Sequence, residues 1–98
     1  RRMNKAEAAW QAKLRDFGCI VCKLDLKVDS PAEIHHMLSG GRRRGEMFVL
    51  PLCQQHHRSG RNDEVVSRDQ SQKRFEARYG TENYLLEETR KLCAALPK

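Results

Sequence analysis

The sequence lacks long apolar stretches and has few aromatic residues. Phe, Trp and Tyr make up 6% of its 98 residues, and hydrophobic residues of all kinds make up 39%. A membrane-spanning helix needs about 20 consecutive apolar residues, and a secretion signal needs an apolar block of about 7 to 15. Since the sequence contains neither pattern, we expect a protein with no membrane partner that resides in a reducing cytoplasm.

Acidic residues are fewer than basic ones. Thirteen Asp and Glu residues stand against nineteen Lys and Arg residues, so the formal net charge is +6. A basic domain attracts polyanions, which favours nucleic acid as the partner. The chain is too short to build two hydrophobic cores, so we expect a single domain over residues 1–98. A domain of this size often needs a metal or disulfides as reinforcement.

Apolar periodicity and helix-capping signals predict an α+β fold. We expect a turn and loop over residues 19–30, and the following regular elements: a helix over 4–17, a hairpin of strands over 32–38 and 47–52, a short helix that begins over 53–58, and two C-terminal helices over 67–79 and 81–96. The helix starts are marked by capping boxes at Asn4 and Ser67 and by a cap at Thr81. The helix ends are marked by Gly18, Gly60, Gly80 and Pro97.

The last helix is predicted to bury one side. The residues that recur there at helical spacing are Leu85, Thr89, Leu92 and Leu96. Cys93 has no cysteine or histidine close to it in the sequence, so we interpret it as an ordinary core residue.

Two pairs of potential metal ligands stand thirty residues apart. Cys19 and Cys22 form one Cys-x-x-Cys turn, and Cys53 and His56 form a Cys-x-x-His turn. Each turn presents two ligands to a tetrahedral ion, so we predict a structural zinc site that ties the end of the first helix to the base of the hairpin. The alternatives are a reducible Cys19/Cys22 pair and four unrelated buried residues.

Three further histidines flank the hairpin. His35 and His36 lie in the first strand, and His57 directly follows the zinc ligand His56. A lone histidine is usually a satisfied surface or core residue, but three on adjoining elements favour a second divalent metal site.

These motifs resemble a known family. Glu33-Ile34-His35-His36-Met37 and Leu50-Pro51-Leu52-Cys53-Gln54-Gln55-His56-His57-Arg58 resemble the ββα-metal core of HNH endonucleases. Gly18-Cys19-Ile20-Val21-Cys22 before that core and Phe75-Glu76-Ala77-Arg78-Tyr79-Gly80-Thr81-Glu82 after it are similar to the phage recombination-enhancement (Ref) branch of RecA-dependent nucleases. The resemblance runs from about Gly18 to Thr89.

The resemblance implies a role for each residue of the second site. His35 would bind the catalytic metal, His36 would activate water, and His57 would be the second metal ligand. Glu33 shares the strand face of His35, where it is expected to orient that imidazole.

Two positions depart from the family pattern. The HNH asparagine would fall near Phe48, so another side chain or a main-chain carbonyl must orient His36. A further histidine of some members falls at Arg61, which cannot bind a metal; Asp63 or water would complete the coordination sphere.

Arginines surround the expected site. Their side chains are either a solvated face or, as we favour, contacts to DNA phosphates that carry little sequence preference. They are Arg42, Arg43 and Arg44 at the hairpin tip and Arg58 and Arg61 on the helix side.

The sequence therefore predicts a monomeric, zinc-stabilised HNH endonuclease. We expect an N-terminal helix over residues 1–18, a zinc-stapled core over 19–61 and C-terminal helices over 62–98 that form a helical hairpin. The active-site ion would be Mg²⁺ or Mn²⁺, with Zn²⁺ or Ni²⁺ as alternatives. The resemblance implies DNA cleavage in phage-type recombination, inside a bacterial host and directed by a RecA filament. The rival hypotheses are a noncatalytic zinc-binding DNA module and a Holliday-junction type resolvase.

Overall fold

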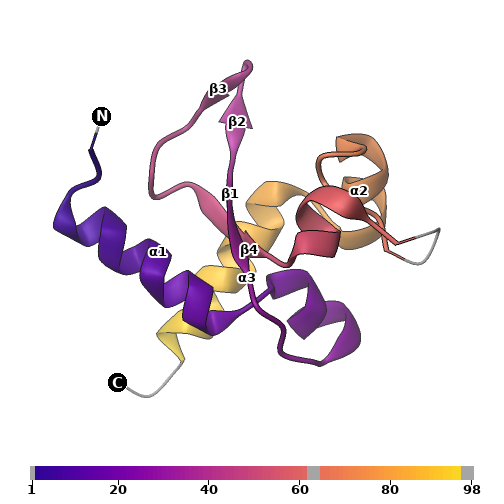
Figure 1. Cartoon of the computed structure of the whole chain (residues 1–98), viewed down its shortest axis with the longest axis horizontal. Helices are drawn as coiled ribbons and strands as arrows, with labels where there is room; N and C mark the ends of the chain where they lie inside the picture. The colour runs from indigo at the N-terminus through magenta and orange to yellow at the C-terminus, as the bar shows by residue number, and fades with distance from the viewer. Residues whose placement is uncertain (1, 62–64, 96–98) are drawn as a thin grey trace.

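The computed structural model describes residues 2–61 and 65–95 and has an α+β fold, as predicted (Figure 1). The elements in chain order are α1 (Lys5–Phe17), η1 (Cys22–Leu26), β1 (Glu33–His36), β2 (Leu38–Ser39), β3 (Arg42–Arg43), β4 (Val49–Leu52), η2 (Gln55–Ser59), α2 (Gln72–Tyr79) and α3 (Glu82–Ala94). The η elements are short helices of the wide π type. None of the helices in the described part is both long and apolar enough to cross a membrane.

The strands of the described residues form two small antiparallel sheets. β1 pairs with β4, with His35 opposite Leu50, and β2 pairs with β3. All of β4 is buried, because α1 and α3 both pack against it. The arm that carries β2 and β3 projects away from the helices (Figure 1). The fold therefore presents β1 and β4 at its centre and a basic hairpin tip at its margin.

The predicted hairpin is shorter and more broken than expected. The strand expected over 32–38 divides into β1 and β2 at the buried residue Met37, and the strand expected to begin at Met47 begins at Val49. The cause is a turn before β4: Gly45 adopts a φ of +134°, and the Phe48 amide donates to the Gly45 carbonyl at 3.2 Å. This turn directs Glu46 toward α1.

Helix capping is confirmed at two of three predicted starts. Asn4 and Glu7 form the capping box of α1, and the Thr81 hydroxyl accepts from the Tyr84 amide at the start of α3. The prediction that a helix begins at Ser67 was wrong. The Ser67 hydroxyl accepts from the Gln70 amide in a turn, and α2 begins only after its own cap, Ser71.

The buried side of α3 also differs from the prediction. Leu85, Thr89 and Cys93 are buried, which confirms Cys93 as a core residue, but Leu92 is 38% exposed. Leu86 is buried as well, so the buried face is centred between Leu85 and Leu86 and leaves Leu92 at its margin. The predicted Leu96 and Pro97 lie outside the described residues.

Candidate metal centres and active site

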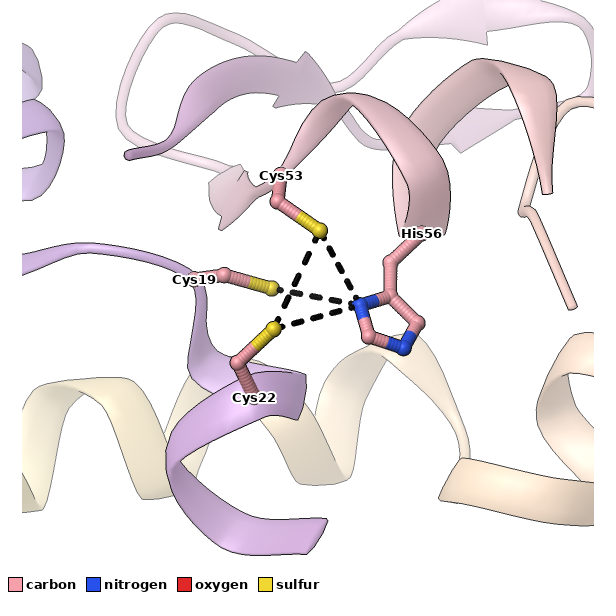
Figure 2. Close-up of side chains that lie close together, drawn as sticks. All are labelled: Cys19, Cys22, Cys53 and His56. Carbon is pink, nitrogen blue, oxygen red and sulfur yellow. Dashed lines mark hydrogen bonds between the residues drawn. The ribbon is translucent and has the colours of Figure 1, made fainter. Parts of the chain in front are cut away.

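The Cys19, Cys22, Cys53 and His56 side chains converge on one point (Figure 2). Their ligand atoms all lie within 4.8 Å of one another. Nδ1 of His56 is 3.6 Å from Sγ of Cys19, 3.5 Å from Sγ of Cys22 and 3.1 Å from Sγ of Cys53, and the last two sulfurs are 3.9 Å apart.

These separations fit a zinc ion. With Zn–S bonds of about 2.3 Å and Zn–N bonds of about 2.0 Å, a tetrahedral site has S···S edges of about 3.8 Å and S···N edges of about 3.5 Å. Cys19 and Cys22 lie where α1 leads into η1, and Cys53 and His56 lie where β4 passes into η2. The cluster could thus hold a metal such as zinc that joins these two parts of the chain.

The ionisation of the cluster points to the same conclusion. A hydrogen bond from Cys19 lowers the pKa of Cys53 to about 3, whereas that bond and burial raise the pKa of Cys19. Burial likewise raises the pKa of Cys22. In the absence of a cation, burial therefore opposes ionisation of Cys19 and Cys22. A divalent ion would supply the positive charge that lets the remaining sulfurs ionise.

A second group brings together His35, His57 and Asp69. One ligand atom from each lies within 4.8 Å of the others. His35 comes from β1, His57 from η2 and Asp69 from the turn before α2, where the Asp69 amide donates to the His57 carbonyl at 2.9 Å. The two histidines were the predicted ligands. Asp69 was missed because no spacing rule links it to them; the predicted candidate, Asp63, lies outside the described residues.

Each imidazole of this group is held by a carboxylate. Nε2 of His35 lies 2.9 Å from Oε2 of Glu82, and Nδ1 of His57 lies 3.0 Å from Oε1 of Glu33. Arg68 donates to the other oxygen of Glu82 at 2.8 Å. A metal-binding histidine commonly donates its second ring nitrogen to a carboxylate, which fixes the tautomer and leaves the other nitrogen for the ion. The group could therefore bind a divalent metal.

The carboxylates of these pairs remain ionised. The hydrogen bond from His57, followed by those from Arg58, lowers the pKa of Glu33. Burial acts to raise the pKa of Glu82, but the hydrogen bonds from His35 and Arg68 outweigh it and leave that pKa below its ordinary value. Both carboxylates are thus acceptors, so the facing imidazole nitrogens carry protons.

The prediction that Glu33 orients His35 was wrong. Glu33 does share the strand face of His35, but its carboxylate accepts from His57 and from Nε and Nη2 of Arg58. Glu82 of α3 occupies the place beside His35 instead. The strand period fixed the face, whereas the packing of η2 and α3 fixed which imidazole each carboxylate meets.

His36 has a different environment from His35. Adjacent residues of a strand point to opposite sides, and His36 faces the turn before β4, with its Nε2 3.0 Å from Oε2 of Glu46. Gln11 of α1 donates to the same carboxylate oxygen at 2.9 Å. Phe48 packs against the guanidinium groups of Arg44 and Arg90 and takes no part in this contact. Glu46 is therefore the group beside His36 that sequence analysis left unidentified.

The arginines predicted to bind DNA differ in the exposure and the contacts of their side chains. Arg42 and Arg43 are exposed on β3. Arg44 donates to Oδ1 of Asn83 at 2.8 Å, and Arg58 makes two bonds to Glu33 although its side chain is 54% exposed. Arg61 is exposed and pairs through its backbone with Val65. The hairpin tip thus offers the most accessible positive charge among these arginines.

The chain matches a known protein family over most of its length. A family model described as recombination enhancement, RecA-dependent nuclease matches residues 5–94. The chain belongs to this family. The description of this RecA-dependent nuclease family indicates an enzyme that acts on DNA in recombination. No curated protein matches the chain.

Membership of the RecA-dependent nuclease family confirms the narrower part of the predicted resemblance. The match begins in α1 and ends in α3, so it contains both groups of side chains that could bind a metal.

Proposed function

We propose that this member of the RecA-dependent nuclease family is a metal-dependent HNH endonuclease that hydrolyses DNA phosphodiester bonds. The convergence of His35, His57 and Asp69 carries the proposal. Two imidazoles, each with one ring nitrogen facing a carboxylate, together with a carboxylate oxygen of Asp69 form an open set of three protein ligands. Such a set leaves coordination positions for a substrate phosphate, whereas the Cys19 group is complete with four.

We propose that the chain supplies metal ligands, a base and an open strand edge for phosphodiester hydrolysis. His35, His57 and Asp69 would hold the ion, which would supply positive charge to stabilise the phosphate and the departing 3′ oxygen. His36 accepts a proton from the attacking water, since its side chain is partly exposed and lies beside these ligands in sequence. β1 pairs with only one strand, β4, in the described part of the chain, so its other edge carries no strand. A phosphodiester that crosses this edge reaches His35 from one side and His36 from the other.

The donor set limits the choice of metal. Two imidazoles and one carboxylate accept Mn²⁺, Zn²⁺ or Ni²⁺ as well as Mg²⁺, and we expect Mg²⁺ or Mn²⁺ to support the reaction. The ion of the Cys19 group would be zinc, because three thiolates and one imidazole favour a softer metal.

The exposed arginines of β3 are proposed to bind the DNA backbone. Arg42 and Arg43 lie on β3, in the arm that projects from the fold (Figure 1). Both side chains are exposed there, so their guanidinium groups would reach DNA phosphates without a rearrangement of the fold. Such contacts carry little base information, so the choice of cleavage site would come from RecA, on which the family description makes the nuclease dependent.

A cleavage assay tests the proposal. Purified protein is incubated with supercoiled plasmid and Mg²⁺ or Mn²⁺, alone and with a RecA filament on a homologous oligonucleotide. We expect metal-dependent cutting that the filament directs, and a loss of about 10²- to 10⁴-fold in rate in His36→Ala with DNA binding retained. A wild-type protein that binds the plasmid and never cuts it would instead support the noncatalytic zinc module. Preferential cutting of a synthetic four-way junction would support a resolvase.

A further inference from the structure

We infer that Glu46, held in place by Gln11, is the residue that positions His36 for proton transfer. This role depends on the proposed function, because His36 is the proposed base. Neither side chain is marked by a motif in the sequence. Together they would take over the positioning role that the HNH pattern gives to an asparagine, whose position here falls near Phe48.

The contacts form a continuous chain from α1 to His36. Gln11 is only 2% exposed, and its Nε2 donates to both the main-chain carbonyl of Glu46, at 2.8 Å, and the carboxylate oxygen Oε2, at 2.9 Å. That same oxygen lies 3.0 Å from Nε2 of His36. One buried amide thus fixes both the backbone and the side chain of Glu46. The carboxylate cannot rotate away from the imidazole without breaking a bond to Gln11.

The chemistry of the contact selects one tautomer of His36. Hydrogen bonds from His36 and Gln11 hold the pKa of Glu46 below its ordinary value, so the carboxylate is ionised and only accepts. Nε2 of His36 must therefore carry the proton of the bond, and in the neutral ring Nδ1 keeps its lone pair. Nδ1 is the nitrogen left to accept a proton from water. When the ring becomes positively charged after that transfer, the adjacent carboxylate stabilises it.

The competing explanation is that Glu46 merely ties the hairpin turn to α1. A tie of that kind would affect stability, and its loss would slow cleavage equally whether or not His36 is present. A positioning residue acts through His36, so its removal has no further effect once His36 is gone. The two explanations therefore differ in a double-mutant cycle.

The experiment measures cleavage and the tautomer of His36 in the zinc-loaded full chain. The variants are Glu46→Ala, Glu46→Gln, His36→Ala and the double variant Glu46→Ala/His36→Ala. Glu88→Gln is the matched control, because it removes a carboxylate that pairs with Lys91 on α3. Plasmid with a RecA–oligonucleotide filament and Mn²⁺ is the substrate, and ¹⁵N–¹H NMR of the histidine rings reports the tautomer. Melting temperatures show which variants fold.

We expect Glu46→Ala to lower kcat about 10- to 100-fold with KM nearly unchanged. Glu46→Gln should retain more activity, since an amide oxygen still accepts from Nε2. The double variant should cut as slowly as His36→Ala alone, and Glu88→Gln should match the wild type. His36 should show a protonated Nε2 in the wild type and a mixture of tautomers in Glu46→Ala.

Two kinetic results for the variants would overturn the inference. Glu46→Ala with wild-type kcat would exclude a positioning role, and a double variant slowed by the product of the single effects would show that Glu46 acts independently of His36. A wild-type chain that never cuts refutes the proposed function and the catalytic part of the inference with it. The NMR measurement tests the contact separately from cleavage. If the ¹⁵N signals of His36 are the same in the wild type and in Glu46→Ala, Glu46 does not select the tautomer of His36.

Discussion

Replacing Cys22 with serine tests whether the four-residue cluster is a structural zinc site. Sγ of Cys22 lies 3.5 Å from Nδ1 of His56 and 3.9 Å from Sγ of Cys53, and the residue is 5% exposed. Serine is similar in size, but its hydroxyl stays protonated and is a poor zinc ligand. The change therefore removes one of the four ligands with little change in packing.

The expected cost is large for so small a domain. Apparent zinc-binding energies at structural sites are about 10–16 kcal/mol, so an equal share for each of four ligands is about 2.5–4 kcal/mol. A chain of this size has a free energy of unfolding of about 5–15 kcal/mol, and each kcal/mol shifts its melting temperature by about 4–8 °C. We expect Cys22→Ser to melt about 10–30 °C below the wild type. The loss of this ligand would destabilise the core, since Cys19, Ile20 and Val21 beside the cluster are at most 1% exposed.

Thermal unfolding followed by circular dichroism, together with metal analysis, checks this expectation. The wild type should carry one tightly held zinc per chain, and Cys22→Ser should lose it under mild chelation. Cys93→Ser is the control, because it also changes a buried thiol but lies outside the cluster. It should keep its zinc and melt within about 10 °C of the wild type. If the two variants kept equal zinc and melted together, the proposed site would be refuted.

Three further predictions concern the second metal group, the pH dependence of stability and DNA binding. Asp69→Asn should weaken Mn²⁺ binding to the zinc-loaded protein by at least about tenfold in calorimetric titrations; unchanged affinity would exclude Asp69 as a ligand. Glu82→Gln should lower the free energy of unfolding in urea by about 3 kcal/mol near neutral pH, because it leaves the buried His35 and the partly buried Arg68 without the carboxylate that faces them. Folding lowers the pKa of Glu82 from 4.5, so this stabilisation is present above pH 4.5 and is lost as the pH falls through the folded-state pKa. The free energies of unfolding of the wild type and Glu82→Gln should therefore converge in acid. A difference that persists there would contradict the stabilising role of the Glu82 carboxylate. Arg42→Ala/Arg43→Ala should reduce the slope of log affinity against log salt by up to about 2 in fluorescence anisotropy with duplex DNA; an unchanged slope would exclude the hairpin as a DNA contact.

Local patterns in the sequence were sufficient for several features. The capping box at Asn4, the cap at Thr81 and each of the two ligand pairs, Cys19/Cys22 and Cys53/His56, depend on spacings of a few residues, which a turn or helix converts directly into geometry. The pairing of His35 with His57 was also predictable, because a hairpin followed at once by a helix leaves little freedom between them.

Local patterns failed where several weak signals competed. Ser67 and Ser71 both precede a residue that can complete a first turn, and only the second begins the helix. Met47 continues the strand pattern, but Gly45 diverts the backbone into a turn before β4.

The partners of the histidines were decided by tertiary structure alone. Glu82 reaches His35 across 47 residues, Gln11 reaches Glu46 across 35, and Glu33 meets His57 rather than its neighbour on the strand face. The sequence determines which side chains can bind a metal, accept a proton or start a helix, because those capacities are properties of the residue and its near neighbours. Which carboxylate meets which imidazole depends on how α1, η2 and α3 pack around β1 and β4, and no spacing along the chain encodes that arrangement.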